Sequence, residues 1–438
     1  GLWAHNLDML PDHGYPAFTG AYPERVAWTS NTSSHCTLMV DDRRSAYSPG
    51  GRLELFAVQP PWRAMAVAAP AAYGAAVQAY RRDVALVDVG PDQSYVLDVF
   101  RARGGSTHRL FLCGGATAAE VSGVALTAQE RGTFAGAEVP LAALPRAGET
   151  TGNTSGFSYL TAVCRSGGTV AAPYTVDWRI EDLRKRIRPG SEPHLRVHAL
   201  TPCDEVALAS GQPPQNRAGN PASLRYLIQS RFGTALRSQY VSVLEPYDKT
   251  PFIRAVRTLR FESDAEPDTV AAVAVDLADG QTDILIACEQ PARVTLDDGI
   301  EMQGQFGLVR RRDGVVTTLR LIGGTRLCAG TAEVRSPQAS WSGTVVRVDV
   351  TNPTDNGIVL DPPLPADPGL VGRPLHFLTA RPADTTFPIR AVAGERVSIG
   401  ELSPVAGFKD PKDFGAGVTF VVNPGDRYRL HALAAWDR

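Results

Sequence analysis

The sequence has no long run of strongly apolar residues and no block of like charges. Its longest weakly polar stretch, AMAVAAPAAYGAAVQAY (residues 64–80), is rich in alanine and is interrupted by Pro70 and Gly74. It is too weakly hydrophobic to span a bilayer as a helix. Lysine and arginine total 44 against 46 acidic residues, so the composition does not favour a nucleic-acid or anionic-membrane surface. We therefore expect no membrane segment and no nucleic-acid partner.

Cysteine is sparse, and its spacing excludes two common site types. No two of the six cysteines stand in a C-x-x-C pair, which argues against a zinc ribbon and against a thioredoxin-type site. Buried free thiols are the favoured interpretation, and disulfides are the alternative. The six are Cys36, Cys113, Cys164, Cys203, Cys288 and Cys328.

Long amphipathic helical patterns are also scarce, whereas short segments of alternating polarity are abundant. Such segments, bounded by Gly, Pro, Asp and Asn, are typical of antiparallel β-structure. Examples are RLELFAV, SYVLDVFRA, HRLFLCGG, TDILIACE, VTTLRLIGG, GTVVRVDVT and VTFVVNPGDRYRLHALA. One segment, WRIEDLRKRI (178–187), fits a short helix because Ile180, Leu183 and Ile187 would share one face; its basic residues are expected to form a solvated face.

The 438 residues exceed the usual size of one compact core, so two domains are expected. Many strands without intervening helices indicate sheets packed face to face. The fold class is therefore predicted to be all-β, with a large antiparallel β-sandwich over residues 1–338 and a smaller C-terminal β domain over residues 339–438. The boundary is placed near SPQASWSG (336–343).

The segment LDMLPDHGYPAFTGAYPERVAWTSNTSSHCTLMVDD (7–42) resembles the heparinase II/III-like polysaccharide lyases. In that family a strand ends in a D-x-G-Y-P bend and is followed by a W-x-S-N-T-x-S-H-N-T-V-V-V-D-like segment. The similarity continues through YRRDVALVDVGPDQSYVLDVFRARGGSTHRLFLCGG (80–115) and YVSVLEPYDKTPFI (240–253). The matching residues of the first segment are Asp12, Gly14, Tyr15, Pro16, Trp28, Ser30, Asn31, Thr32, Ser34, His35, Thr37, Val40 and Asp41.

The resemblance implies a lyase that cleaves uronate-containing acidic polysaccharide, such as a glycosaminoglycan, by β-elimination. Such a lyase has an N-terminal α/α toroid, a central β-sandwich and a smaller C-terminal β domain. The chain lacks the toroid and is expected to be the C-terminal β portion of a lyase, inactive when isolated. A secreted or periplasmic location follows from the substrate class. The alternative function is a non-catalytic β module that binds carbohydrate or packs against another domain.

The resemblance also places a metal at Asp12 and His35. A third protein ligand is expected before Gly1, where the family carries an H-x-H-x-D-type segment. Carboxylate oxygen and imidazole nitrogen are donors that zinc or a similar divalent ion accepts, and a site needs three or four of them. Without the resemblance, Asp12 would be read as a turn former and His35 as a hydrogen-bonded core residue. The metal site is expected to be incomplete in this chain.

Three further residues bear on the site. Tyr15, held by Gly14 and Pro16, is the candidate catalytic or sugar-contacting residue, with packing as the alternative. The resemblance implies that the main acid/base tyrosine belongs to the toroid. Cys36 stands where the family has asparagine, so any orienting amide hydrogen bond is altered. His108 matches a family block, but a single histidine beside a glycine turn is expected to be structural.

Overall fold

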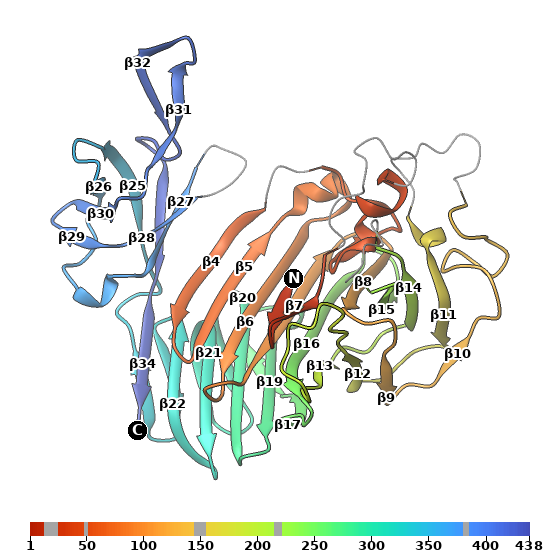
Figure 1. The fold of residues 1–438 in the computed structure, drawn as a ribbon. Helices are drawn as coiled ribbons and strands as arrows, with labels where there is room; N and C mark the ends of the chain where they lie inside the picture. The colour runs from red at the N-terminus through yellow and green to blue at the C-terminus, as the bar shows by residue number, and fades with distance from the viewer. Residues whose placement is uncertain (13–24, 48–50, 144–154, 214–220, 380–384) are drawn as a thin grey trace. The chain divides into compact units, whose positions relative to one another are not determined.

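The computed structural model describes residues 1–12, 25–47, 51–143, 155–213, 221–379 and 385–438, and strands dominate it (Figure 1). Two compact units can be separated. Unit 1 comprises Gly1–Tyr47, Pro70–Thr258 and Val273–Thr282, and unit 2 comprises Ser48–Ala69, Leu259–Ala272 and Asp283–Arg438. The expected boundary between residues 338 and 339 stays a prediction.

Unit 1 contains a six-stranded antiparallel sheet that carries most of the resemblance segments. One of its two edge strands, β3, pairs with β8 in the register Leu38↔Leu110 and Val40↔His108. The order across the sheet is β10 (Leu126–Ala128), β11 (Leu160–Ser166), β14 (Glu205–Gly211), β15 (Leu224–Phe232), β8 (Thr107–Gly114) and β3 (Leu38–Val40).

Six further strands of unit 1 belong to a second antiparallel sheet, and two strand pairs complete the description of the unit. The sheet order is β6 (Ala79–Asp88), β7 (Ser94–Arg103), β16 (Arg237–Asp248), β13 (Pro193–Ala199), β12 (Tyr174–Arg179) and β9 (Glu120–Ser122). The pairs are β1 (Leu2–Ala4) with β2 (Leu7–Leu10), and β17 (Ile253–Thr258) with β19 (Val270–Leu277).

The two large sheets of unit 1 pack face to face as a sandwich. The indole N–H of Trp178 on β12 donates to the carbonyl of Arg225 on β15 at 2.8 Å, and the Tyr240 hydroxyl on β16 donates to the carbonyl of His108 on β8 at 2.9 Å. Gly114 on β8 leaves room for the Trp178 ring, since a Cβ atom there would lie 2.3 Å from it. Both large aromatic side chains are fully buried, so most of their surface is removed from water, which favours folding.

The six-stranded sheet is also covered on its other face, and this explains why β8 is buried almost throughout instead of alternating. Phe111 and Cys113 point away from Trp178 and join a hydrophobic cluster with Trp28, Phe157 and Tyr226. A strand buried on both faces loses the polar alternation of a half-exposed strand. The segment around Trp28 therefore forms part of a cover over the outer face of this sheet.

The described part of unit 2 contains two hairpins and the strands of two sheets. The hairpin of β4 and β5 carries Trp62, whose ring meets Phe306 edge to face with centroids 6.2 Å apart. In the first hairpin, β4 is Arg52–Gln59 and β5 is Trp62–Ala68. One sheet includes, within unit 2, the strands β18 (Phe261–Ser263), β20 (Gln281–Leu296), β21 (Glu301–Arg312), β22 (Val315–Ile322), β23 (Arg326–Ala329), β24 (Ala332–Arg335) and β34 (Leu433–Asp437). The other sheet has the order β28 (Thr385–Pro388), β27 (Pro374–Leu378), β33 (Arg427–His431), β25 (Ser340–Asp349), β26 (Asn356–Asp361), β30 (Arg396–Gly400) and β29 (Ala391–Ala393). The second hairpin pairs β31 (Val405–Asp410) with β32 (Asp413–Phe420).

Helical structure within the described ranges is limited to single turns. They are η1 (Arg25–Thr29), η2 (Thr32–Ser34), η3 (Pro70–Ala72), η4 (Gly74–Ala76), η6 (Phe157–Tyr159), η7 (Pro267–Thr269) and η8 (Pro368–Leu370). Over these same ranges, no helix has the length and apolar character needed to cross a bilayer. The all-β, sandwich-type prediction is confirmed.

The helix expected over residues 178–187 is wrong. Trp178 and Arg179 end strand β12, and a loop follows. The Asp182 carboxylate accepts the backbone N–H groups of Arg186 and Ile187 at 2.9 and 3.0 Å. An aspartate that bonds nearby backbone in this way competes with helical hydrogen bonds, and Leu183, which the helix would have buried, is exposed.

Candidate functional site

The turn that carries His35 is anchored by a buried tryptophan. Trp28, at 1% exposure, lies in η1, and its indole N–H donates to the carbonyl of Gln212 at 2.8 Å. Its ring stacks on Tyr159, with centroids 5.8 Å apart, and meets Tyr226 edge to face. Such aromatic contacts add to the free energy of area burial, so the turn is fastened to the outer face of the six-stranded sheet.

Polar groups buried within the turn hold its shape. The Asn31 amide donates to the carbonyl of Ala27 at 3.2 Å, and its oxygen accepts the backbone N–H of Ser33 at 3.4 Å as the N-cap of η2. The Ser34 hydroxyl donates to the carbonyl of Asn31 at 2.8 Å, and the Tyr226 hydroxyl donates to the carbonyl of Ser34 at 2.8 Å. The S-N-T-x-S residues of the motif thus form the turn itself.

Asp12 and His35 meet at the end of this turn, although 23 positions separate them. The Oδ1 atom of Asp12 lies 3.0 Å from Nδ1 of His35. The side chains are 68% and 34% exposed, respectively. The hydrogen bond that His35 makes to the Asp12 carboxylate raises the pKa of His35 above its ordinary value, against the opposing effect of burial. The structure therefore brings together the two residues at which the resemblance places a metal.

The donor atoms of this pair are compatible with a shared divalent ion. Ligands about 2.1 Å from a tetrahedral zinc lie roughly 3.4 Å apart, so the 3.0 Å between Asp12 and His35 would need to widen only slightly. In the part of the chain that the structure describes, no group of three or more His, Cys, Asp or Glu side chains is arranged to hold a metal. The pair would supply two donors to such an ion, and no third donor joins them among the described residues.

Tyr15, the candidate catalytic residue, lies outside the described residues, as do Gly14 and Pro16. Its role stays a prediction.

Cys36 directly follows His35 and faces a second thiol. Its sulfur lies 3.2 Å from Sγ of Cys113 and accepts the backbone N–H of Cys113 at 3.3 Å. The thiol of Cys113 bonded to it lowers the pKa of Cys36, whereas the same contact and burial raise the pKa of Cys113. In the family that the sequence resembles, this position carries an asparagine. Here it carries Cys36, which forms a thiol pair with Cys113.

Two other residues of the resemblance have structural roles. His108 is fully buried, with Nδ1 2.8 Å from the Ser238 hydroxyl and Nε2 2.7 Å from the carbonyl of Gly104. Asp41 accepts the backbone N–H groups of Ser106 and Thr107 at 2.6 and 3.1 Å. Burial opposes its ionisation, but these donors hold the pKa of Asp41 below its ordinary value. Both residues secure the turn that leads into β8.

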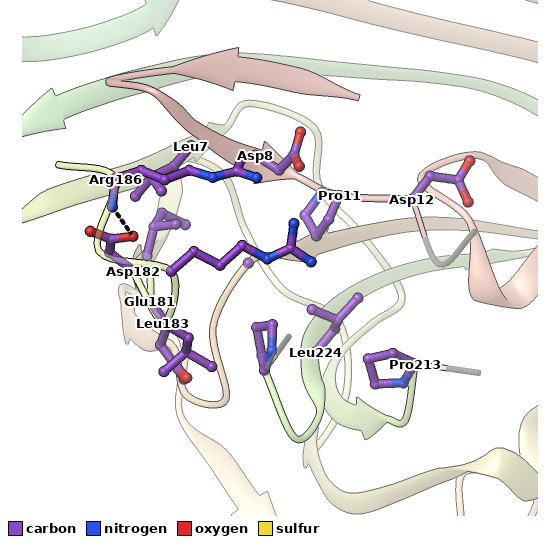
Figure 2. A pocket seen from close by; sticks show the side chains of 14 residues that line it. Leu7, Asp8, Pro11, Asp12, Glu181, Asp182, Leu183, Arg186, Pro213 and Leu224 are labelled. Carbon is purple, nitrogen blue, oxygen red and sulfur yellow. Dashed lines mark hydrogen bonds between the residues drawn. The ribbon is translucent and has the colours of Figure 1, made fainter. Parts of the chain in front are cut away.

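A pocket of unit 1 has Asp12 in its wall (Figure 2). The loop after β12 forms another part of the wall and contributes Arg184 and Arg186, both exposed. Figure 2 shows the bond between the Arg186 backbone and the Asp182 carboxylate that shapes this loop. The sequence interpretation missed these arginines as pocket residues because it placed them on the solvated face of a helix. The full lining is Leu7, Asp8, Pro11, Asp12, Gly115, Ile180, Glu181, Asp182, Leu183, Arg184, Arg186, Pro213, Pro221 and Leu224.

Comparisons with known proteins give distant structural similarity only. No protein-family model matches the chain, and no curated protein matches it. Among solved structures, the heparinase III BT4657 gene product is 11% identical with a TM-score of 0.39 over 69% of this chain and 34% of that chain. The heparan sulfate lyase HepC from Pedobacter heparinus is 12% identical with a TM-score of 0.38 over 62% of this chain and 33% of that chain.

A third chain, described as heparinase III, is 13% identical with a TM-score of 0.36, over 65% of this chain and 34% of its own length. The matches thus span about a third of the neighbours' chains. At these values the similarity assigns neither an activity nor site residues to this protein.

Proposed function

We propose that this chain is the β portion of a polysaccharide lyase that cleaves uronate-containing acidic polysaccharide by β-elimination. The observation that carries the proposal is the contact between Asp12 and His35 at 3.0 Å. Two residues picked out by a sequence motif, 23 positions apart, meet at the end of a buried turn with the donor atoms of a divalent-metal site. The proposal includes a secreted or periplasmic location, where such polysaccharides occur.

The chemistry of the proposal uses groups near this contact. Elimination on a uronate needs neutralisation of the carboxylate, removal of the C5 proton and protonation of the departing C4 oxygen. Asp12 and His35 would hold zinc or a similar ion, which supplies positive charge and rigidity when bound. Arg184 and Arg186 line the pocket that Asp12 also lines, and guanidinium groups suit carboxylates and sulfates. Tyr15 is the proposed catalytic or sugar-contacting side chain.

A complete active site would need a second wall. Proton abstraction and leaving-group protonation require groups fixed on opposite sides of the sugar, and a misplacement of about 1 Å costs much of the rate. We assign that wall, and the remaining metal ligands, to an α/α toroid domain of a longer protein. The 438-residue chain alone is accordingly expected to give no rise in ultraviolet absorbance from unsaturated uronates with heparan sulfate or alginate, whereas the protein with its toroid gives one.

Metal analysis tests the central observation directly. Elemental analysis of the toroid-containing protein is expected to find about one zinc or similar ion per chain, lost in Asp12→Ala and in His35→Ala. The matched control is His194→Ala, because His194 forms a comparable contact with Asp177 at 2.7 Å on β13 and β12; its metal content should equal that of the wild type. Equal metal content in all three variants would rule out the assignment.

The activity assay separates the two function classes. In the toroid-containing protein, Tyr15→Phe should lower turnover if Tyr15 lines the cleft and leave it unchanged if Tyr15 only packs. Strong elimination by the isolated chain would contradict the placement of the active site between two domains. Glycan binding without elimination by either protein would instead identify a non-catalytic carbohydrate-binding module.

A further inference from the structure

Cys36 and Cys113 form a thiol pair beneath the His35 turn. Their sulfur atoms are 3.2 Å apart, although 77 positions separate the two residues. Cys113 is fully buried in β8, and Cys36 is only half-buried. The other cysteines differ in their neighbours: Cys164 accepts a guanidinium N–H of Arg225, and Cys203 contacts the carbonyl of Thr201.

Backbone pairing fixes this approach. The N–H of Phe111 donates to the carbonyl of Thr37 at 2.9 Å, and β3 then continues the antiparallel register with β8. The N–H of Cys113 itself donates to the sulfur of Cys36. The register pairs Leu38 with Leu110, so Cys36 lies one position out of register with Cys113, and the close approach is that of the two sulfur atoms at 3.2 Å. A disulfide requires them to move to about 2.05 Å.

We propose that Cys36 and Cys113 form a disulfide when the protein meets a low-molecular-weight disulfide oxidant, and that this bond fastens the His35 turn to strand β8. The proposal is independent of the lyase activity. It makes the pair a modification site within the core, selected by geometry from six cysteines that carry no C-x-x-C signature.

The exposure of the two residues sets the order of the reaction. Cys36, the more exposed of the two residues, attacks one sulfur of the oxidant; its S–H proton and the electron pair of the broken S–S bond leave with the first small thiol. Cys113 then attacks Sγ of Cys36 in the mixed disulfide, and its proton leaves with the second small thiol. The protein loses two hydrogen atoms, and the oxidant is reduced to two thiols.

The bond would also change the neighbourhood of Asp12. The sulfur of Cys113 lies 3.4 Å from the carbonyl of Pro11, directly before Asp12, as well as beside the sulfur of Cys36. Oxidation removes the one S–H proton that Cys113 can donate to either of them, while it holds Cys36, next to His35, against β8. The thiol pair therefore contacts the chain beside both residues of the Asp12–His35 contact: Cys113 contacts Pro11, and Cys36 follows His35.

The test is oxidation of the native full chain with oxidised glutathione, followed by alkylation and non-reducing peptide mapping. The expected product is a Cys36–Cys113 linked peptide with a mass loss of about 2 Da, while the other four cysteines remain alkylated. The oxidised wild type should also have a higher Tm than its reduced form, because the bond closes a long loop in the unfolded chain.

Variants separate this pair from general thiol oxidation. Cys36→Ser and Cys113→Ser should each abolish the linked peptide and the rise in Tm, while the control Cys288→Ser, at a buried cysteine in unit 2, should keep both. If a variant fails to fold, the linked peptide and the Tm of the oxidised wild type still test the proposal. Stable mixed disulfides with glutathione on Cys36, or a linked peptide that forms only in urea, would overturn the proposal.

Discussion

The hydroxyl of Tyr226 is predicted to hold the turn that presents His35. Tyr226 is fully buried on β15, and its hydroxyl donates to the carbonyl of Ser34 at 2.8 Å. Burial raises the pKa of Tyr226 well above its ordinary value, so the hydroxyl remains a donor throughout the neutral and mildly alkaline range. Tyr226→Phe removes this one donor and leaves the ring against Trp28.

The expected magnitude follows from the group left without a partner. A buried carbonyl that loses its hydrogen bond costs about 1–3 kcal/mol, and the phenyl ring keeps nearly all of the packing. We expect Tyr226→Phe to lower the free energy of local opening of the turn by about 1–2 kcal/mol. This corresponds to amide exchange that is faster by roughly 5- to 30-fold, at about 1.4 kcal/mol for each factor of ten.

Hydrogen exchange followed by mass spectrometry measures this effect on peptides that cover residues 25–38. The His35 amide is the most direct reporter, since it donates to the carbonyl of Thr32 at 3.2 Å. The pKa of His35, followed by NMR, should fall toward its ordinary value, because a looser turn weakens the bond to Asp12 that raises it.

A matched variant in unit 2 separates a local effect from a general one. Tyr428 is likewise buried, and its hydroxyl donates to the carbonyl of Pro362. Tyr428→Phe should speed exchange near Pro362 and leave residues 25–38 and the pKa of His35 unchanged. Exchange in Tyr226→Phe that equals the wild type over residues 32–35 would refute the idea that this hydroxyl holds the turn.

Two further predictions concern stability. Burial lowers the pKa of His431 to about 4, so its contribution to stability is complete above about pH 6.5 and is lost as the pH falls from there toward 4, by up to about 3 kcal/mol. His431→Gln should flatten this acid slope in urea unfolding, and an unchanged slope would contradict the cause. Gly114→Ala places a Cβ 2.3 Å from the Trp178 ring and should cost about 1–3 kcal/mol. Gly167→Ala, which meets no atom within 4 Å, should change stability by less than about 0.5 kcal/mol; equal effects of the two variants would argue against overpacking.

Local pattern was sufficient to predict the class of fold. Alternating segments such as SYVLDVFRA and HRLFLCGG coincide with β7 and β8, because side-chain alternation is a property of the extended chain itself. The motif containing His35 was recognisable for a similar reason: its asparagine and serines form a turn with their own neighbours. The interpretation of residues 178–187 as a helix failed because the Asp182 side chain bonds the local backbone in a competing way.

Contacts between distant segments required the tertiary structure. The approach of Asp12 to His35 was expected only through a family resemblance. The distance of 3.0 Å between their side chains depends on where the tertiary structure places Asp12 relative to the turn that ends at His35. The Cys36–Cys113 pair had no sequence signature, since its two sulfur atoms meet at 3.2 Å only because the segment before β3 lies beside β8, 77 positions away along the chain. Alternation along a strand specifies which side chains share a face, but not which strand lies beside it. Strand pairing and register depend on the packing of the whole sheet. Strand pairing and register therefore decided which side chains meet at the site.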